Sequence, residues 1–137
     1  MSAASFGSRR GFQDRTEAQD CYDLIEWLAR QPFASGKVGM MGCSYLGGTT
    51  FQTATTAPPS LKAAFIGATE LDKYSFVRRG GITAQFNTRP DEPLSEDLMS
   101  VPLDGDTDGA LLREAVAMHA QNTPMAGLWY GMPTRDA

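Results

Sequence analysis

The segment that most constrains the fold runs from residue 37 to residue 47 and reads Lys-Val-Gly-Met-Met-Gly-Cys-Ser-Tyr-Leu-Gly. A short apolar run followed by Gly-x-Ser and small residues is typical of a nucleophile elbow, a sharp strand-to-helix turn that exposes one serine hydroxyl. Gly42 suits such a turn, because a residue without Cβ tolerates crowded or positive-φ backbone. The pattern therefore predicts that Ser44 is a catalytic nucleophile. The strict Gly-x-Ser-x-Gly pentapeptide is not met, because its last position is Leu46 and the glycine, Gly47, comes one residue later.

A serine nucleophile needs a base, a group that orients the base, and donors for the oxyanion. The elbow supplies one donor locally, the backbone N–H of Tyr45, in the first turn of a helix whose positive dipole end favours a developing negative charge. We therefore predict Ser44 and Tyr45 as catalytic residues. The competing interpretation of Ser44 is a small residue in an ordinary strand-to-helix turn.

The sequence before and after the elbow predicts alternating helices and strands. Thr16 and Gln19 fit a capping box that opens a helix, and its apolar residues recur at helical spacing on one core-facing stripe, namely Cys21, Leu24, Ile25 and Leu28. Strands are expected at residues 38–41 and 61–68. The helix expected between them, at residues 45–56, is rich in threonine and glycine and has poor intrinsic propensity, so burial must hold it.

This alternation predicts an α/β fold with a parallel sheet. Two strands are too few for such a sheet, because parallel strands need several neighbours and cover on both faces. We therefore expect the missing strands to come from another chain or from a longer polypeptide of which this sequence is a piece. The expected domains are an α/β core segment with the elbow at residues 1–75 and a second segment at residues 76–137.

Composition excludes several classes of function. The 137 residues carry a formal charge of −4 and are 42% hydrophobic, which argues against nucleic acid or an anionic membrane as partner and is compatible with a packed core. No apolar run is long enough to span a bilayer, and the N-terminal residues do not resemble a secretory signal peptide. Cys21 and Cys43 lack metal spacing and are expected to be two buried or partly buried thiols rather than a disulfide. The expected location is the cytoplasm.

The single histidine, His119, is the obvious candidate for the base. Leu112, Ala115 and Val116 precede it at helical spacing, in a helix expected at residues 109–121 with Asp108 as its N-cap, so His119 lies on an apolar face. Two interpretations remain open: a packed structural residue or the base of a triad. The order Ser, acid, His found in hydrolases of this type does not decide between them.

Two further motifs have competing interpretations. Residues 104–109 copy the first half of a calcium loop, but the position of its bidentate glutamate falls on Ala115, so an acidic loop that caps a helix is the better interpretation. The pair Arg78 and Arg79 suits a substrate carboxylate or simply a solvated surface. No metal ion or cofactor is expected.

The motifs resemble those of the CocE/NonD group of serine hydrolases, which includes cocaine esterase, α-amino-acid ester hydrolases and X-Pro dipeptidyl-peptidases. The resemblance covers about residues 10–75 and rests on Glu-Trp-Leu-Ala at 26–29, Gln-Pro-Phe at 31–33, Gly-Lys-Val-Gly-Met at 36–40, Gly-Cys-Ser-Tyr-Leu-Gly at 42–47 and Pro-Pro-Ser-Leu-Lys-Ala at 58–63. Residues 76–137 are similar, less closely, to the helical cap of such enzymes.

The resemblance implies part of an α/β-hydrolase fold, with Ser44 as acyl acceptor and the Tyr45 N–H as one oxyanion donor. In that family the second donor is a tyrosine hydroxyl upstream of the residues present here, and the acid and histidine follow the cap, past Ala137. Such a chain is expected to be inactive, or nearly so, by itself, because the acid and base are absent.

The leading hypothesis is a hydrolase that cleaves a small-molecule ester or amide through an acyl-enzyme at Ser44. A second hypothesis is a non-catalytic module that pairs its sheet with a partner, since exposed strand edges favour association; a homo-oligomer or a complementary segment would then cover the sheet. A third is a self-contained hydrolase that uses His119.

Overall fold

The computed structural model describes all residues except 1–4, 12, 84–92, 132 and 136–137. The chain divides into two compact units, one formed by Gln13–Phe76 and the other by Met1–Phe12 together with Val77–Ala137. We call the first the elbow unit and the second the terminal unit. The prediction of a core at residues 1–75 and a cap at residues 76–137 stays a prediction, and residues 84–92 within it lie outside the described residues.

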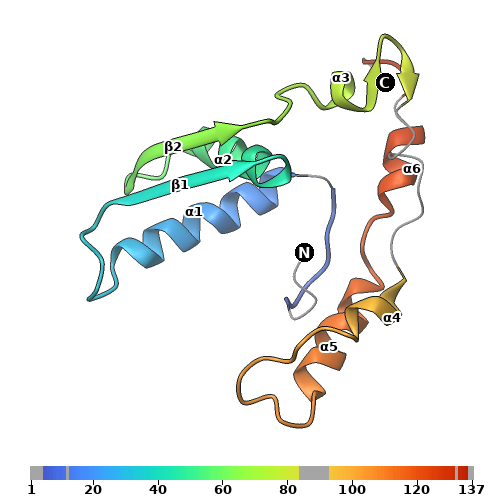
Figure 1. The fold of residues 1–137 in the computed structure, drawn as a ribbon. Coiled ribbons are helices and arrows are strands. Elements are labelled where there is room, and N and C mark those ends of the chain that lie inside the picture. The colour runs from blue at the N-terminus through green and yellow to red at the C-terminus, as the bar shows by residue number, and fades with distance from the viewer. Residues whose placement is uncertain (1–4, 12, 84–92, 132, 136–137) are drawn as a thin grey trace. The chain divides into compact units, whose positions relative to one another are not determined.

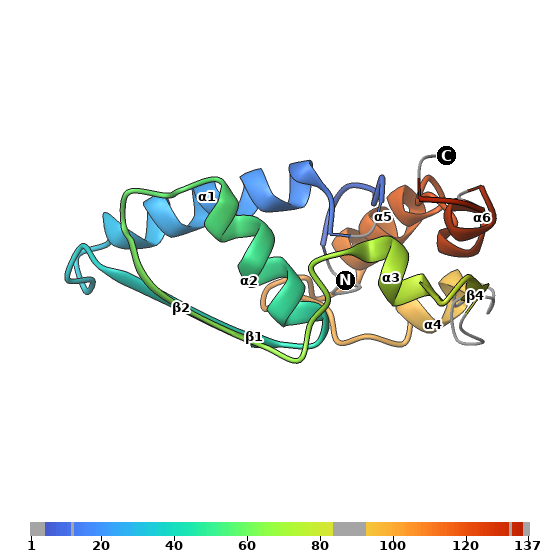
Figure 2. The ribbon, with the colours of Figure 1, turned by 90° about the horizontal axis from the view of Figure 1, so that it is seen from above.

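The elbow unit alternates helices and strands, as the sequence predicts. Its elements are α1 (Arg15–Ala29), β1 (Val38–Cys43), α2 (Tyr45–Thr55), β2 (Leu61–Gly67) and the start of α3 (Lys73–Val77). β1 and β2 pair in parallel, with Met41 opposite Phe65 and Cys43 opposite Gly67. Both helices lie on one side of the strand pair (Figure 1; Figure 2). This is the strand–helix–strand unit of a parallel sheet.

The N-terminus of α1 differs from the prediction. The helix begins at Arg15 with Asp14 as N-cap, and the Asp14 carboxylate accepts from the Glu17 N–H at 2.9 Å. The predicted box of Thr16 and Gln19 is therefore wrong. Asp14 competes successfully because an ionised carboxylate at the N-cap is favoured by the helix dipole as well as by the hydrogen bond.

The apolar face of α1 is also narrower than predicted. Ile25 is buried together with Ala18, whereas Leu24 is 53% exposed. Both cysteines are free thiols, as expected, and Cys21 is partly buried; the predicted burial of Cys43 is wrong, because this residue is exposed at the end of β1. The buried face of α1 is narrow because α1 packs chiefly against α2. The first turn of α2 contains glycines, which have no side chain to cover more of α1.

α2 is held by burial, as its poor propensity requires. Thr50 and Thr53 are fully buried, and their hydroxyls donate to the carbonyls of Leu46 and Thr49, four residues earlier, at 2.8 and 2.7 Å. A buried hydroxyl is costly unless it is hydrogen-bonded, so these bonds within the helix let threonine occupy the interior.

One face of the strand pair is open. Met41 is 77% exposed and Phe65 is 68% exposed, and together with Gly39, Met40, Ala63 and Ala64 they line a shallow apolar surface. Among the described residues of this sheet, each strand has a single neighbour. The elbow unit thus covers one face of its parallel sheet and leaves the other bare.

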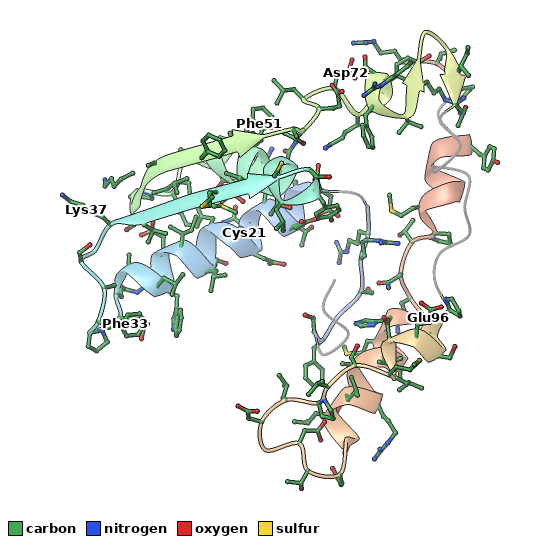
Figure 3. All side chains as sticks on the ribbon, viewed as in Figure 1. Cys21, Phe33, Lys37, Phe51, Asp72 and Glu96 are labelled. Atoms are coloured by element: carbon green, nitrogen blue, oxygen red, sulfur yellow. The ribbon has the colours of Figure 1, made fainter. Side chains whose placement is uncertain are left out.

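The loop between α1 and β1 lies at the end of the unit opposite the elbow. Figure 3 shows Phe33 in the loop after α1 and Lys37 just before β1, and Phe33 is 80% exposed. The segment Gln-Pro-Phe is therefore far along the strand from Ser44. Any role it has at the elbow is indirect.

The terminal unit consists of short elements, namely β3 (Arg78–Arg79), β4 (Ile82–Thr83), α4 (Leu94–Asp97), α5 (Ala110–His119) and α6 (Met125–Tyr130). Its small core includes Leu112 and Val116 of α5. The N-terminal segment binds beside the end of α5: the Arg9 N–H donates to Asn122 Oδ1 at 2.6 Å, and the Thr123 N–H donates to the Arg9 carbonyl at 2.8 Å. Residues more than a hundred positions apart therefore belong to one unit.

The acidic loop caps α5 through a different aspartate from the one predicted. The Asp106 carboxylate accepts from the N–H groups of Leu111 and Leu112 at 3.1 and 2.9 Å, whereas the Asp108 carboxylate accepts from the Ala110 N–H at 3.1 Å. The backbone N-cap position itself is Gly109, with φ of 69°. Asp108 as the principal cap is therefore wrong.

In the part of the chain that the structure describes, no helix is long and apolar enough to cross a membrane. The expected cytoplasmic location stays a prediction.

Candidate active site

Ser44 occupies the turn between β1 and α2, where the sequence places the elbow. Its backbone has φ of 57° and ψ of −125°, a positive φ that is uncommon for a residue with a side chain. The Ser44 N–H donates to the Gly67 carbonyl at 3.1 Å, which ties the turn to the end of β2. The residue is exposed, and its hydroxyl makes no cap hydrogen bond to α2. Backbone strain of this kind costs on the order of 1–3 kcal/mol and often marks functional sites.

Two glycines make the turn possible. A Cβ at Gly42 would lie 2.1 Å from the Leu46 carbonyl oxygen, and a Cβ at Gly47 would lie 2.5 Å from the Gly67 carbonyl oxygen. Both distances are shorter than any real Cβ contact, so only glycine fits. The position three residues after Ser44 is therefore the one that packs α2 against β2, which explains why Leu46 is tolerated where the strict pentapeptide has glycine.

Tyr45 is the first residue of α2, so its N–H belongs to the first turn of the helix. N–H groups of a first turn have no partner within the helix and point toward its N-terminal end. Its phenol donates to Glu17 Oε2 at 3.0 Å, and its carbonyl accepts from Gln13 Nε2 at 2.6 Å. Ser44 and Tyr45 are thus adjacent at the N-terminal end of one helix. Their catalytic roles stay predictions.

Several polar side chains lie beside the elbow without any signal in the local sequence. Glu17 Oε1 accepts from the Thr49 hydroxyl at 2.9 Å, and the Lys73 ammonium contacts the Gln13 side-chain carbonyl. Burial lowers the pKa of Lys73 from its ordinary value, and the carboxylates of Glu17 and Glu70 oppose that shift. Glu17 looks like an ordinary residue of a first helical turn, and no local pattern indicates that it faces α2.

The aspartate that follows β2 has a structural role. Asp72 accepts from the Ser75 hydroxyl at 2.6 Å and from the Tyr74 N–H at 3.1 Å, at the start of α3 (Figure 3). Its carboxylate therefore helps to begin a helix. This makes Asp72 a poor candidate for orienting a catalytic base.

His119 is buried in the terminal unit, with 3% of its surface exposed. Its Nδ1 lies 2.9 Å from Asp97 Oδ2, and its Nε2 lies 2.8 Å from the Ser5 carbonyl oxygen. Both ring nitrogens are engaged, so a serine hydroxyl could reach neither without breaking one of these contacts. The geometry favours the packed interpretation of His119 over the triad base.

The other motifs also take structural roles. The carboxylates of Asp106 and Asp108 serve the N-terminus of α5, and no group of three or more metal-ligating side chains occurs among the described residues. Arg78 lies in β3, where its guanidinium donates to the Thr83 hydroxyl at 2.6 Å. A role for Arg78 and Arg79 toward a substrate carboxylate stays a prediction.

Comparisons with known proteins agree with this geometry. Residues 2–128 match the model of a family described as X-Pro dipeptidyl-peptidase (S15 family). A stretch of 55 residues, 40% of this chain, is 38% identical to cocaine esterase from Rhodococcus sp. (strain MB1 Bresler), of which it covers 10%. An alignment of 154 positions, covering 98% of this chain, is 27% identical to the protein named "Putative serine esterase Mb1866c" from Mycobacterium bovis, of which it covers 24%.

A solved structure is similar in fold. A CocE/NonD family hydrolase from Staphylococcus aureus superposes with a TM-score of 0.65 and 24% identity, over 93% of this chain and 20% of that one. The expected α/β fold class, with a parallel sheet, is thereby confirmed. The chain spans between about a tenth and a quarter of the length of these proteins.

Proposed function

The chain belongs to the X-Pro dipeptidyl-peptidase (S15) family, a family of serine hydrolases, and on that premise we propose that Ser44 is the nucleophile of a hydrolase that cleaves an ester or amide bond. The observation that carries the proposal is the conformation of Ser44: an exposed serine at positive φ between a parallel strand and the helix that follows it. This is the geometry that lets a serine at such a turn meet a carbonyl carbon.

In the proposed reaction, Ser44 Oγ attacks the carbonyl carbon of the substrate, and a base takes the hydroxyl proton. The Tyr45 N–H donates to the resulting oxyanion, where the N-terminal dipole of α2 adds to its effect. The alcohol or amine then leaves with a proton, so that an acyl ester on Ser44 remains. Water hydrolyses that ester and regenerates the hydroxyl.

We do not assign the base to His119, because Asp97 and the Ser5 carbonyl already contact its two ring nitrogens. General-base catalysis contributes roughly 10²- to 10⁴-fold to such reactions. We therefore expect this chain alone to react slowly with an ester and to turn over little or none of it.

The test is covalent labelling of the full chain with a fluorophosphonate probe, with free imidazole added to replace the base. We expect modification of Ser44 above the other serines, a rate that rises with imidazole concentration, and loss of the modification in Ser44→Ala. Ser60→Ala is the matched control and should label normally. Labelling spread evenly over several serines, or unchanged in Ser44→Ala, would overturn the proposal.

His119→Ala separates this proposal from a self-contained hydrolase. We expect the variant to label at Ser44 at the rate of the wild type. Loss of labelling in His119→Ala, and also in Asp97→Asn, would instead identify His119 as the base.

The open sheet face favours a second candidate function, a non-catalytic module that pairs its sheet with a partner. Met41 and Phe65 expose apolar surface of the kind that interfaces bury. Size-exclusion chromatography with light scattering tests it: a stable oligomer of one size that does not label at Ser44 would favour the module over the hydrolase.

A further inference from the structure

A carboxylate on α1 binds the first turns of α2 at two points. Glu17 uses one oxygen for the Tyr45 phenol, at 3.0 Å, and the other for the Thr49 hydroxyl, at 2.9 Å. Tyr45 and Thr49 are four residues apart and therefore neighbours on the helix surface. Hydrogen bonds to an ionised acceptor are roughly twice as strong as neutral ones. Glu17 thus spans the turn of α2 that follows the candidate nucleophile.

Gln13 holds the same residue from a second direction. Its side-chain N–H donates to the Tyr45 carbonyl at 2.6 Å, and its side-chain carbonyl meets the Lys73 ammonium. The residue is 5% exposed and has a left-handed backbone, with φ of 53°. Its amide also lies against Gly48, where a Cβ would come within 2.1 Å of Nε2. A buried, strained glutamine with both ends of its amide engaged is tightly constrained.

We infer that Glu17 and Gln13 are positioning residues of the elbow, which fix Tyr45 at its phenol and its carbonyl so that its N–H keeps one orientation at the end of α2. This inference rests on the proposed role of Ser44 and Tyr45. An oxyanion donor must be held within about 0.5 Å of its productive position, and a first helical turn with no such support tends to fray.

The chain contains a matched control on the same helix. Glu26 also uses both carboxylate oxygens, for the N–H and the hydroxyl of Ser60 at 2.8 and 3.0 Å. Ser60 lies just before β2, at the end of the unit opposite the elbow. Removal of the Glu26 charge therefore costs a similar pair of bonds but touches nothing near Ser44.

Amide hydrogen exchange of the full chain, followed by NMR, tests the inference. The reporters are the N–H groups of Gly48, which bonds to the Ser44 carbonyl at 3.0 Å, and of Thr49. We expect Glu17→Gln to speed exchange at both about 10- to 100-fold, as loss of charged hydrogen bonds predicts. Exchange in the last turn of α2 should change little, and Tyr45→Phe should reproduce part of the effect.

Glu26→Gln should leave Gly48 and Thr49 unchanged and instead speed exchange at Leu61, whose N–H bonds to Pro58 beside Ser60. Unchanged protection of Gly48 and Thr49 in Glu17→Gln, or an equal loss throughout α1, β1 and β2, would overturn the inference. A Tyr45→Phe/Glu17→Gln double variant should add little to Glu17→Gln, because both changes act on the same hydrogen bond, between the Tyr45 phenol and the side chain at position 17.

Probe labelling separates this inference from the proposed function on which it rests. Glu17→Gln should lower the maximal rate of Ser44 modification about 10-fold without changing the probe concentration at half-saturation, whereas Glu26→Gln should change neither. A wild-type chain that does not label at Ser44 counts against the nucleophile, even where exchange shows that Glu17 holds the turn. If Glu17→Gln labels Ser44 at the wild-type rate, the positioning role of Glu17 is contradicted and the proposed role of Ser44 as nucleophile is not.

Discussion

The two units of this chain are stabilised in different ways. In the elbow unit, elements adjacent in sequence pack on one another, and close backbone approaches at Gly42 and Gly47 set their spacing. In the terminal unit, the N-terminal segment reaches across more than a hundred residues to contact the end of α5. Local patterns therefore describe the first unit well, and they reveal little of the second.

The difference shows where each unit is sensitive to change. The elbow unit requires glycine at positions 42 and 47, because the methyl group of an alanine at either position would overlap neighbouring backbone atoms. The terminal unit depends on a few polar contacts around a small core, of which His119 makes two. Single substitutions in each unit should therefore have separate effects.

Gly42→Ala should damage the elbow unit most. Its new Cβ would lie 2.1 Å from the Leu46 carbonyl oxygen, so α2 must move or the turn must open. We expect a loss of about 4 kcal/mol or more in the free energy of unfolding of this unit, at the severe end for single substitutions. Urea unfolding followed by NMR cross-peaks of each unit measures it.

Gly39→Ala is the control on the same strand, because its Cβ would meet only the Ala63 carbonyl oxygen, at 4.0 Å. This variant should have nearly unchanged stability. Equal losses in the two variants would show that the close approach at Gly42 is not what limits the turn.

His119→Ala should destabilise the terminal unit by about 3 kcal/mol, because it removes two hydrogen bonds and leaves a cavity at a buried site. Exchange of the α5 amides should speed up, and exchange in α2 should stay as in the wild type. Glu114→Gln, an exposed change on the same helix, serves as the control. Loss of protection in α2 would mean that the two units unfold together.

Acid should weaken the terminal unit through Asp106. Burial opposes ionisation of this carboxyl, but the N–H groups of Leu112, Leu111 and Ala110 and the charge of Arg113 hold its pKa below the ordinary value. A folded-state pKa below that of the unfolded chain, about 3.9 for aspartate, gives stability that is present above pH 4 and is lost as pH falls through the folded-state pKa.

Asp106→Asn should flatten this acid dependence of α5 protection between pH 5 and pH 2, which NMR-detected exchange measures. Asp108→Asn, with a single backbone contact, should retain most of it. The same acid loss in the wild type and in Asp106→Asn would assign the effect to another carboxyl group.

Whereas acid should destabilise the terminal unit, mild alkali should stabilise the elbow unit, by a smaller amount. Burial lowers the pKa of Lys73, so the unfolded chain binds more protons between that pKa and the ordinary value near 10.4. Stability of this unit should therefore rise with pH across that window. Lys73→Met should abolish the rise, as urea midpoints at pH 8 and pH 10 would show. A rise that persists in Lys73→Met points to another group.

Much of the elbow unit follows from its sequence. The glycine spacing, the apolar strands and the helical periodicity predict α1, β1, α2 and β2 with small errors at their ends. The errors concern single residues. Asp14 caps α1 in place of Thr16, and Leu24 is more exposed than its helical spacing suggests.

The candidate site is less predictable. Ser44 and Tyr45 follow from the motif, whereas Gln13, Glu17 and Lys73 do not, because they face the elbow from segments that are distant from it in the sequence. Likewise, a helical wheel places His119 on an apolar face but does not reveal that Ser5 and Asp97 are its partners. Such contacts arise from tertiary packing, for which a single sequence holds no local signal.

Glu17 and Glu26 both lie on α1 and each binds a different segment of the elbow unit, so the number of residues between them is constrained. Insertion or deletion of one residue between them would turn everything downstream by about 100° and would carry one carboxylate away from its partner. Length variation among relatives should therefore concentrate in the loop before β1, where Phe33 is exposed, and should spare the interval between the two glutamates.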